Sequence, residues 1–90
     1  MKIIITQLID IKEKVRFYIE SNFFLGTNST INDNDSFLDN GIIDSTGVLE
    51  ITGFILSEFN LYIEDKEMLP SNLDSINQIA NFVNNKMSSK

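Results

Sequence analysis

Apolar residues recur near the start of the chain at the spacing of a helix. Five of them follow one another at intervals of four, three, four and three residues: Ile4, Leu8, Ile11, Val15 and Tyr18. Residues at this spacing share one face of an α-helix. Four charged residues of the same segment are turned mainly to water: Lys12, Glu13, Arg16 and Glu20. The pattern therefore predicts an amphipathic helix over residues 4–22.

Three further helical elements follow. A helix over residues 45–59 is predicted because Asp44 and Ser45 supply capping chemistry before an apolar face, which comprises Val48, Leu49, Ile51, Thr52, Ile55, Leu56 and Phe59. A short element over residues 64–69 is expected to stop at Pro70. A last helix over residues 73–87 is indicated by Ile76, Ile79, Ala80, Val83 and Met87. Only Leu61-Tyr62-Ile63 resembles a β-strand.

A long polar connection, residues 26–43, separates the first two helices. Long loops within a domain are usually functional or held down by their own side chains, and five apolar residues favour the second case: Ile31, Phe37, Leu38, Ile42 and Ile43. The Asp and Asn residues suggest a calcium loop. An EF-hand register beginning at Asp33 puts Phe37 and Leu38 where a ligand and the turn glycine belong, which excludes that pattern.

Together these elements predict one all-α domain over residues 1–90, a small antiparallel four-helix bundle of three main helices and one short helix with a long first loop. The chain has no Cys and no His. It therefore lacks disulfides, thiolate or imidazole metal sites, and the usual proton-transfer group of hydrolases and transferases. We expect a protein that is not an enzyme.

The charge is acidic and unevenly distributed. Between Asp33 and Asp74, ten carboxylates stand against Lys66 alone, a local net charge of −9. Such a field repels nucleic acid and anionic membranes and attracts basic protein partners, although a solvated surface that maintains solubility gives the same composition. Gln7 and Asp10 interrupt the first apolar run, so we expect no signal peptide, no membrane insertion and a cytoplasmic location.

One stretch carries a recognisable motif. Gly41-Ile42-Ile43-Asp44-Ser45 leads from the long loop into the second helix, and Glu50 follows five residues after the serine. With the order of helices and the later Pro70…Leu73-Asp74-Ser75-Ile76, this resembles the acyl carrier protein family over nearly the whole chain. Asp-Ser before an apolar helix is commonly just an N-cap, and Asp74-Ser75 is interpreted as capping alone because it lacks the preceding glycine loop.

The resemblance implies that Ser45 carries a 4′-phosphopantetheine arm, transferred from coenzyme A by a separate phosphopantetheinyl transferase. The thiol of the arm would hold an acyl or aminoacyl group as a thioester. It also implies a monomer that a ligase or synthase loads and that a downstream acyltransferase unloads. Asp44 would contribute to recognition by the transferase and other partners. The serine needs no base of its own, since the transferase activates it.

The second helix departs from the usual family pattern. Thr46 stands where most members have leucine, and helical projection puts Thr46, Glu50, Gly53 and Ser57 on one outward stripe with Gly47 and Phe54 beside it. Thr46, Glu50 and Phe54 are therefore candidate partner-recognition residues alongside Asp44. The glycines either let a partner helix approach closely or merely loosen the helix.

With these departures, the sequence pattern resembles stand-alone carriers of specialised pathways more than carriers of fatty-acid synthesis. D-alanyl carriers and carriers paired with an adenylating ligase are examples of the stand-alone kind. Fatty-acid and secondary-metabolite synthesis both remain open. The alternative hypothesis is an unmodified helical protein-interaction module with a carrier-like fold.

Overall fold

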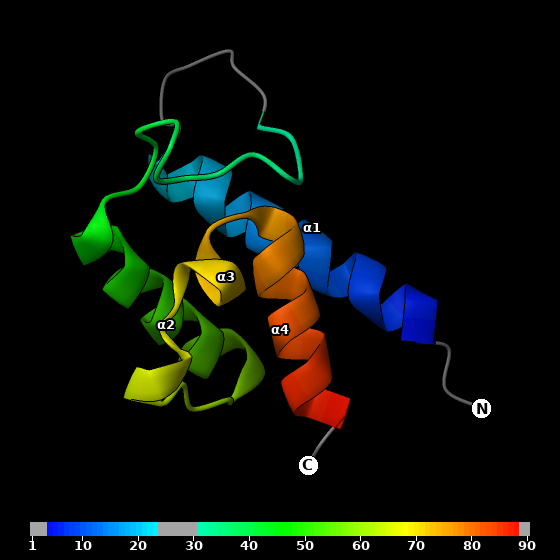
Figure 1. The fold of residues 1–90 in the computed structure, drawn as a ribbon. Helices are drawn as coiled ribbons and strands as arrows, with labels where there is room; N and C mark the ends of the chain where they lie inside the picture. Colours follow the sequence, from blue (N-terminus) through cyan, green and yellow to red (C-terminus); the bar gives the residue numbers. More distant parts are fainter. Residues whose placement is uncertain (1–3, 24–30, 89–90) are drawn as a thin grey trace.

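The computed structural model describes residues 4–23 and 31–88. Within these ranges the regular elements are α1 (Ile4–Phe23), α2 (Ser45–Phe59), the 3₁₀ turn η1 (Asp65–Glu67), α3 (Pro70–Leu73) and α4 (Ile76–Ser88), as Figure 1 shows. The described residues include no β-strand. The predicted all-α class is therefore confirmed, with three longer helices and one short one. The first part of the predicted loop, residues 26–30, lies outside the described residues.

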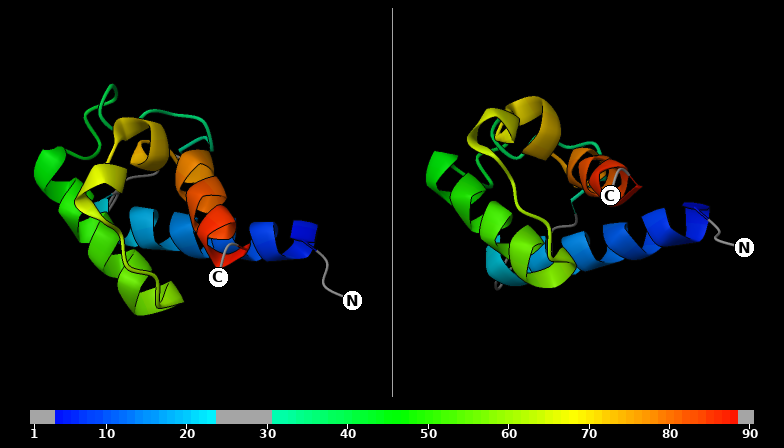
Figure 2. Two further views of the ribbon diagram at one scale, coloured as in Figure 1. Left: turned by 60° about the horizontal axis from the view of Figure 1, so that its bottom comes forward. Right: turned by 90° about the horizontal axis from the view of Figure 1, so that it is seen from below.

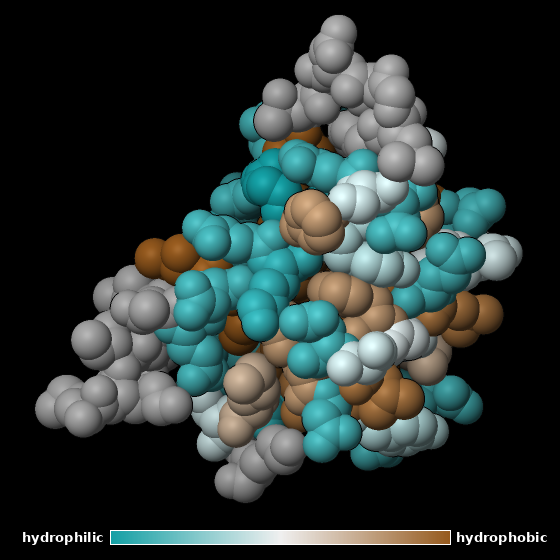
Figure 3. Space-filling model, turned by 180° about the vertical axis from the view of Figure 1, so that it is seen from behind, coloured by the Kyte–Doolittle hydropathy of each residue, from teal (hydrophilic) through white to brown (hydrophobic). Residues whose placement is uncertain are grey.

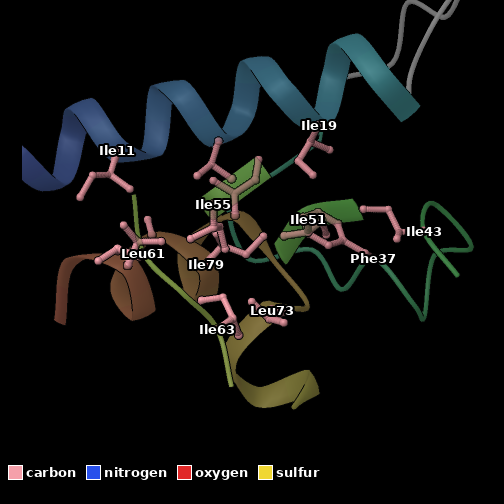
Figure 4. Packing of buried hydrophobic residues seen from close by; sticks show 14 of the residues in the cluster. Ile11, Ile19, Phe37, Ile43, Ile51, Ile55, Leu61, Ile63, Leu73 and Ile79 are labelled. Carbon is pink, nitrogen blue, oxygen red and sulfur yellow. The ribbon is translucent and has the colours of Figure 1, made fainter. Parts of the chain in front are cut away.

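The hydrophobic core lies where α1, α2 and α4 converge. Its fully buried side chains come from all three helices and from the segments between them (Figure 4), and include Ile11, Val15 and Ile19 of α1, Ile51 and Ile55 of α2, and Ile76, Ile79, Ala80 and Val83 of α4. α4 crosses α1 and packs against it, and α3 packs against the start of α4 (Figure 2). Burial of these aliphatic side chains is the main force that holds the helices together.

The periodic pattern of α1 is confirmed where the structure describes it. Ile11 and Val15 are buried, and Leu8 and Tyr18 are half-buried. The side chain of Ile4, which was also assigned to this face, lies outside the described part. Two large apolar residues of α1 point to solvent instead: Ile9 is 50% exposed and Phe17 is 74% exposed.

The predicted buried face of α2 was too wide. Ile51 and Ile55 are buried, and Val48, Thr52 and Phe59 are half-buried, but Leu49 and Leu56 are 59% and 47% exposed. A helix that contacts the core along one side buries only a limited arc of its surface. Leu49 and Leu56 lie outside that arc.

The segment around Pro70 was predicted incorrectly. The expected helix over 64–69 is limited to η1, where Glu64 and Glu67 form a capping box. Pro70 begins α3 and does not end the preceding element. Proline is well tolerated at the first position of a helix, because the N–H that it lacks would have no acceptor within the helix there. Leu61-Tyr62-Ile63 belongs to the irregular connection between α2 and η1, and it has no strand partner among the described residues.

The last helix begins at Ile76 instead of residue 73, because Ser75 caps it. Ser75 Oγ accepts a hydrogen bond from the Gln78 N–H at 3.1 Å, and Ser75 is 4% exposed. An N-cap residue has a non-helical backbone, which separates α3 from α4. The interpretation as a cap is thus supported for Ser75. It does not hold for Asp74, whose carboxylate accepts hydrogen bonds from Ser36 and Leu38 of the loop.

The described part of the long loop is held at two places. Near its start, the Asp33 carboxylate contacts Lys12 Nζ at 2.8 Å and the Arg16 guanidinium, and Arg16 also donates to the Ile31 carbonyl at 2.7 Å. Farther on, the Asp74 carboxylate accepts from the Ser36 hydroxyl and from the Leu38 N–H at 2.9 Å. Ile31, Phe37 and Ile43 are buried, as predicted, whereas Leu38 is 41% exposed.

Substitution of Asp33 by Asn should weaken the protein mainly above acidic pH. Hydrogen bonds from Lys12 and Arg16 lower the pKa of Asp33 despite partial burial. A carboxylate with a lowered folded-state pKa stabilises the fold above its unfolded pKa, and that contribution disappears as the pH falls through the folded pKa. We expect Asp33→Asn to lower the free energy of unfolding by about 1 kcal/mol at pH 7. As the pH falls below about 4, the stability of the wild type should decrease more than that of the variant, so the difference between them should shrink.

Urea unfolding at pH 7, 5 and 3 measures this difference. Asp39→Asn is the matched control, because the exposed Asp39 side chain has no ion-pair partner within the described ranges. Equal stability of Asp33→Asn and Asp39→Asn at pH 7 would contradict the role given to Asp33.

Candidate functional site

The start of α2 is fixed by Asp44. Its backbone is extended (φ −96°, ψ −177°), and its Oδ1 accepts a hydrogen bond from the Gly47 N–H at 2.9 Å. The Asp44 carbonyl accepts from the Val48 N–H at 3.2 Å. Asp44 is therefore the N-cap, as the sequence predicts, and Ser45 is the first residue of the helix. The first-turn N–H groups and the helix dipole give this end a partial positive charge.

A tight turn delivers Asp44 and Ser45 to this position. Gly41 adopts a left-handed conformation (φ 68°), which only glycine adopts without strain. The Phe37 carbonyl accepts hydrogen bonds from the N–H groups of Ile42 at 2.9 Å and Ile43 at 3.4 Å. Since the Phe37 side chain is 1% exposed, the turn is anchored directly to the core.

Gly47 brings the turn and the helix close together. It is buried, and a Cβ at this position would lie 2.5 Å from Ile43 Cγ2. The predicted position of Gly47 beside the outward stripe is therefore wrong, because its close neighbour is Ile43 of the same chain. Of the two interpretations left open for the glycines, close approach of a partner helix does not apply at position 47. Gly53 differs, because it is exposed and a Cβ there would have no atom within 4 Å.

Alanine substitutions at the two glycines of α2 should have opposite effects. Gly47→Ala forces the buried Ile43 to move, and overpacking of this kind costs about 1–3 kcal/mol. Gly53→Ala adds a good helix former in open space and should stabilise the protein by about 0.5–1 kcal/mol. Chemical denaturation of the two variants measures both changes. The same sign for both variants would show that the contact between positions 47 and 43 does not constrain the turn.

The outward stripe of α2 is exposed as predicted. Thr46, Glu50, Gly53 and Ser57 are all exposed to solvent. Beyond Asp44, therefore, Thr46 and Glu50 are the candidate recognition residues that the structure leaves fully available.

Phe54 lies apart from the fully exposed stripe. It is half-buried, and its ring stacks on Tyr18 of α1 with centroids 4.1 Å apart and planes at 13°. Tyr18 also donates its hydroxyl to the Glu50 carbonyl at 3.2 Å, and burial, followed by the Glu50 charge, raises the Tyr18 pKa. Phe54 thus joins α2 to α1, and only the remainder of its ring is available to a partner.

An apolar pocket that the sequence did not predict lies beside the same end of α2. Its volume is about 270 Å³, and its lining comes from the loop, α2 and the region of α3: Leu38, Val48, Leu49, Met68, Leu69, Pro70, Leu73 and Asp74. Val48 and Leu49 are three and four residues after Ser45, a spacing that places residues on one helix face about one turn apart. The exposed Leu38, Leu49 and Leu69 are therefore walls of a pocket next to the start of α2.

Comparison with known proteins gives no family. No protein-family model and no curated protein matches the chain. Within the described residues, no group of three or more Asp, Glu, His or Cys side chains could hold a metal ion, and no helix is both long and apolar enough to cross a membrane.

Proposed function

We propose that the protein is a carrier whose Ser45 bears a 4′-phosphopantetheine arm, and that the four helices form an acyl-carrier-like domain. The observation that carries the proposal is the position of Ser45, directly after the Asp44 cap at the first residue of α2. The side-chain cap of α2 comes from the Asp44 carboxylate, which accepts the Gly47 N–H. The side chain of Ser45 itself lies outside the described part of the structure.

The electrostatics of this helix end suit a phosphodiester. An anion at a helix N-terminus is stabilised by first-turn N–H groups and by the positive end of the dipole, by about 0.3–1 kcal/mol at an exposed position. The loop that leads to Ser45 is fixed by Gly41 and by the buried Phe37, so a transferase would meet a preformed turn.

The pocket beside α2 supports the carrier proposal further. At about 270 Å³ it is slightly below the usual range of small-molecule pockets, about 300–1,000 Å³, and its walls are mainly aliphatic. An acyl group held as a thioester on the arm could make apolar contacts in this pocket, which begins about one helical turn after Ser45. We therefore propose a small acyl or aminoacyl cargo, loaded by a ligase or synthase and removed by an acyltransferase.

The proposal is tested by incubating the purified protein with coenzyme A and a phosphopantetheinyl transferase of broad specificity. Intact-mass spectrometry should show complete conversion to a species heavier by one phosphopantetheine. An established carrier treated in parallel shows that the transferase is active. An unchanged mass beside a converted control carrier would contradict the proposal.

A further inference from the structure

A groove separates α1 from α2 on the side away from α3. It has a volume of about 300 Å³ and is lined by Asp10, Glu13, Lys14 and Phe17 of α1 and by Phe54 and Glu58 of α2. The α1 residues are spaced so that they share one helix face. α1 lies at the back in Figure 1, and the view from behind in Figure 3 shows hydrophobic surface interspersed with hydrophilic surface on this side.

The apolar part of the groove comes from two phenylalanines. Phe17 is 74% exposed, which is unusual for so large an apolar side chain. Tyr18 stacks on one face of the Phe54 ring and Phe59 packs against it in an edge-to-face arrangement. The part of the ring that these two leave uncovered contributes to the groove. The two rings therefore offer aromatic surface to an apolar side chain that enters between the helices.

The rim of the groove is acidic. Among the side chains that the structure describes, none forms a hydrogen bond or ion pair with the carboxylates of Asp10 and Glu13. Lys14 Nζ contacts Glu58 Oε2 at 3.3 Å across the groove, with side chains 55% and 41% exposed. An exposed pair of this kind contributes at most about 1 kcal/mol, so an incoming cation can displace Lys14. The three carboxylates and one ammonium leave a net charge of −2.

We propose that this groove binds a basic amphipathic helix of another protein, with one large apolar side chain between Phe17 and Phe54 and flanking Lys or Arg side chains on the carboxylates. Helices commonly dock in grooves through such apolar anchors, and complementary charges fix their orientation. A second copy of this chain is a poor occupant, since each copy carries a net charge of −6 and would bring like charges together.

The groove is separate from the start of α2 and from the pocket beside α3, because it shares no lining residue with that pocket. Its occupancy does not depend on the modification of Ser45. The unmodified protein is therefore the correct sample, and a negative result here would leave the carrier proposal unaffected.

The test uses a synthetic helical peptide of Leu, Lys and Ala with one leucine flanked by lysines on a single face, and a scrambled peptide of the same composition. Two-dimensional ¹⁵N–¹H NMR should show the largest shift changes at residues 10–17 and 54–58. Phe17→Ser should weaken binding at least tenfold, while Leu49→Ser, in the other pocket, should leave it unchanged. Raising the NaCl concentration should weaken binding through screening.

Circular dichroism checks that Phe17→Ser is folded, which is expected for so exposed a position. Shift changes centred on the pocket beside α3, or equal binding by the scrambled peptide and the Phe17→Ser variant, would overturn the proposal. Analytical ultracentrifugation tests whether a second copy of the chain occupies the groove. If the wild type is a dimer and the Phe17→Ser variant is a monomer, the groove binds a second copy and the proposal is wrong.

Discussion

Ser45→Ala is expected to abolish attachment of phosphopantetheine completely. The proposed chemistry forms a bond from the serine oxygen to the phosphate of the arm, with release of adenosine 3′,5′-bisphosphate from coenzyme A, and alanine has no oxygen to form that bond. Asp44, not the serine, caps α2 through the Gly47 N–H, so the variant should remain folded. Intact-mass spectrometry after treatment with the transferase measures the loss.

Two other serines provide controls for this prediction. Ser57 is exposed on the same helix, and Ser57→Ala should be modified as fully as the wild type. Ser75 is buried and caps α4, so it should stay unmodified in Ser45→Ala. Modification of Ser45→Ala to the wild-type extent would mean that another hydroxyl receives the arm.

Phe37→Ala is expected to be the most damaging substitution for stability. The ring is 1% exposed, and truncation of a buried phenylalanine costs about 3–5 kcal/mol, a large share of the 5–15 kcal/mol typical of small domains. The Phe37 carbonyl also receives the hydrogen bonds from Ile42 and Ile43, so release of the ring should loosen the turn before Ser45. Urea unfolding measures the first effect, and the initial rate of modification by the transferase measures the second.

Leu38→Ala is the matched control, because Leu38 is the next residue and is 41% exposed. It should cost less than about 1 kcal/mol, within the ordinary range for surface positions. If Phe37→Ala does not fold, Phe37→Leu supplies the measurement, with an expected loss nearer 1–1.5 kcal/mol. Equal losses for Phe37→Ala and Leu38→Ala would show that Phe37 does not anchor the loop.

The helices could be predicted from the sequence because their signals are local. The spacing of Ile11 and Val15 and the capping chemistry of Asp44 act within a turn or two of the chain, and the structure contains both features. The break between α3 and α4 was missed because several local preferences competed there. Pro70 can end one helix or begin another, and Ser75 caps α4 only two residues after α3 ends at Leu73.

The features that depend on distant segments could not be predicted. Leu49 was assigned to the core by its apolar character, yet it forms the wall of a pocket whose other residues come from the loop and from the region of α3. The decisive neighbours of Leu49 belong to other segments, so helical periodicity alone carries no information about them. For Gly47 the sequence leaves two interpretations open, and neither includes the close approach to Ile43, four residues earlier.

Localisation of the arm in the wild-type protein is the most direct test of the proposed function. After treatment with coenzyme A and transferase, cleavage after glutamate yields residues 21–50, which contain Ser45, and residues 68–90, which contain Ser75. Fragmentation mass spectrometry should place one phosphopantetheine on Ser45 and none on the second peptide. An unmodified peptide 21–50, beside a fully converted control carrier, would contradict the carrier proposal and favour an unmodified helical interaction module.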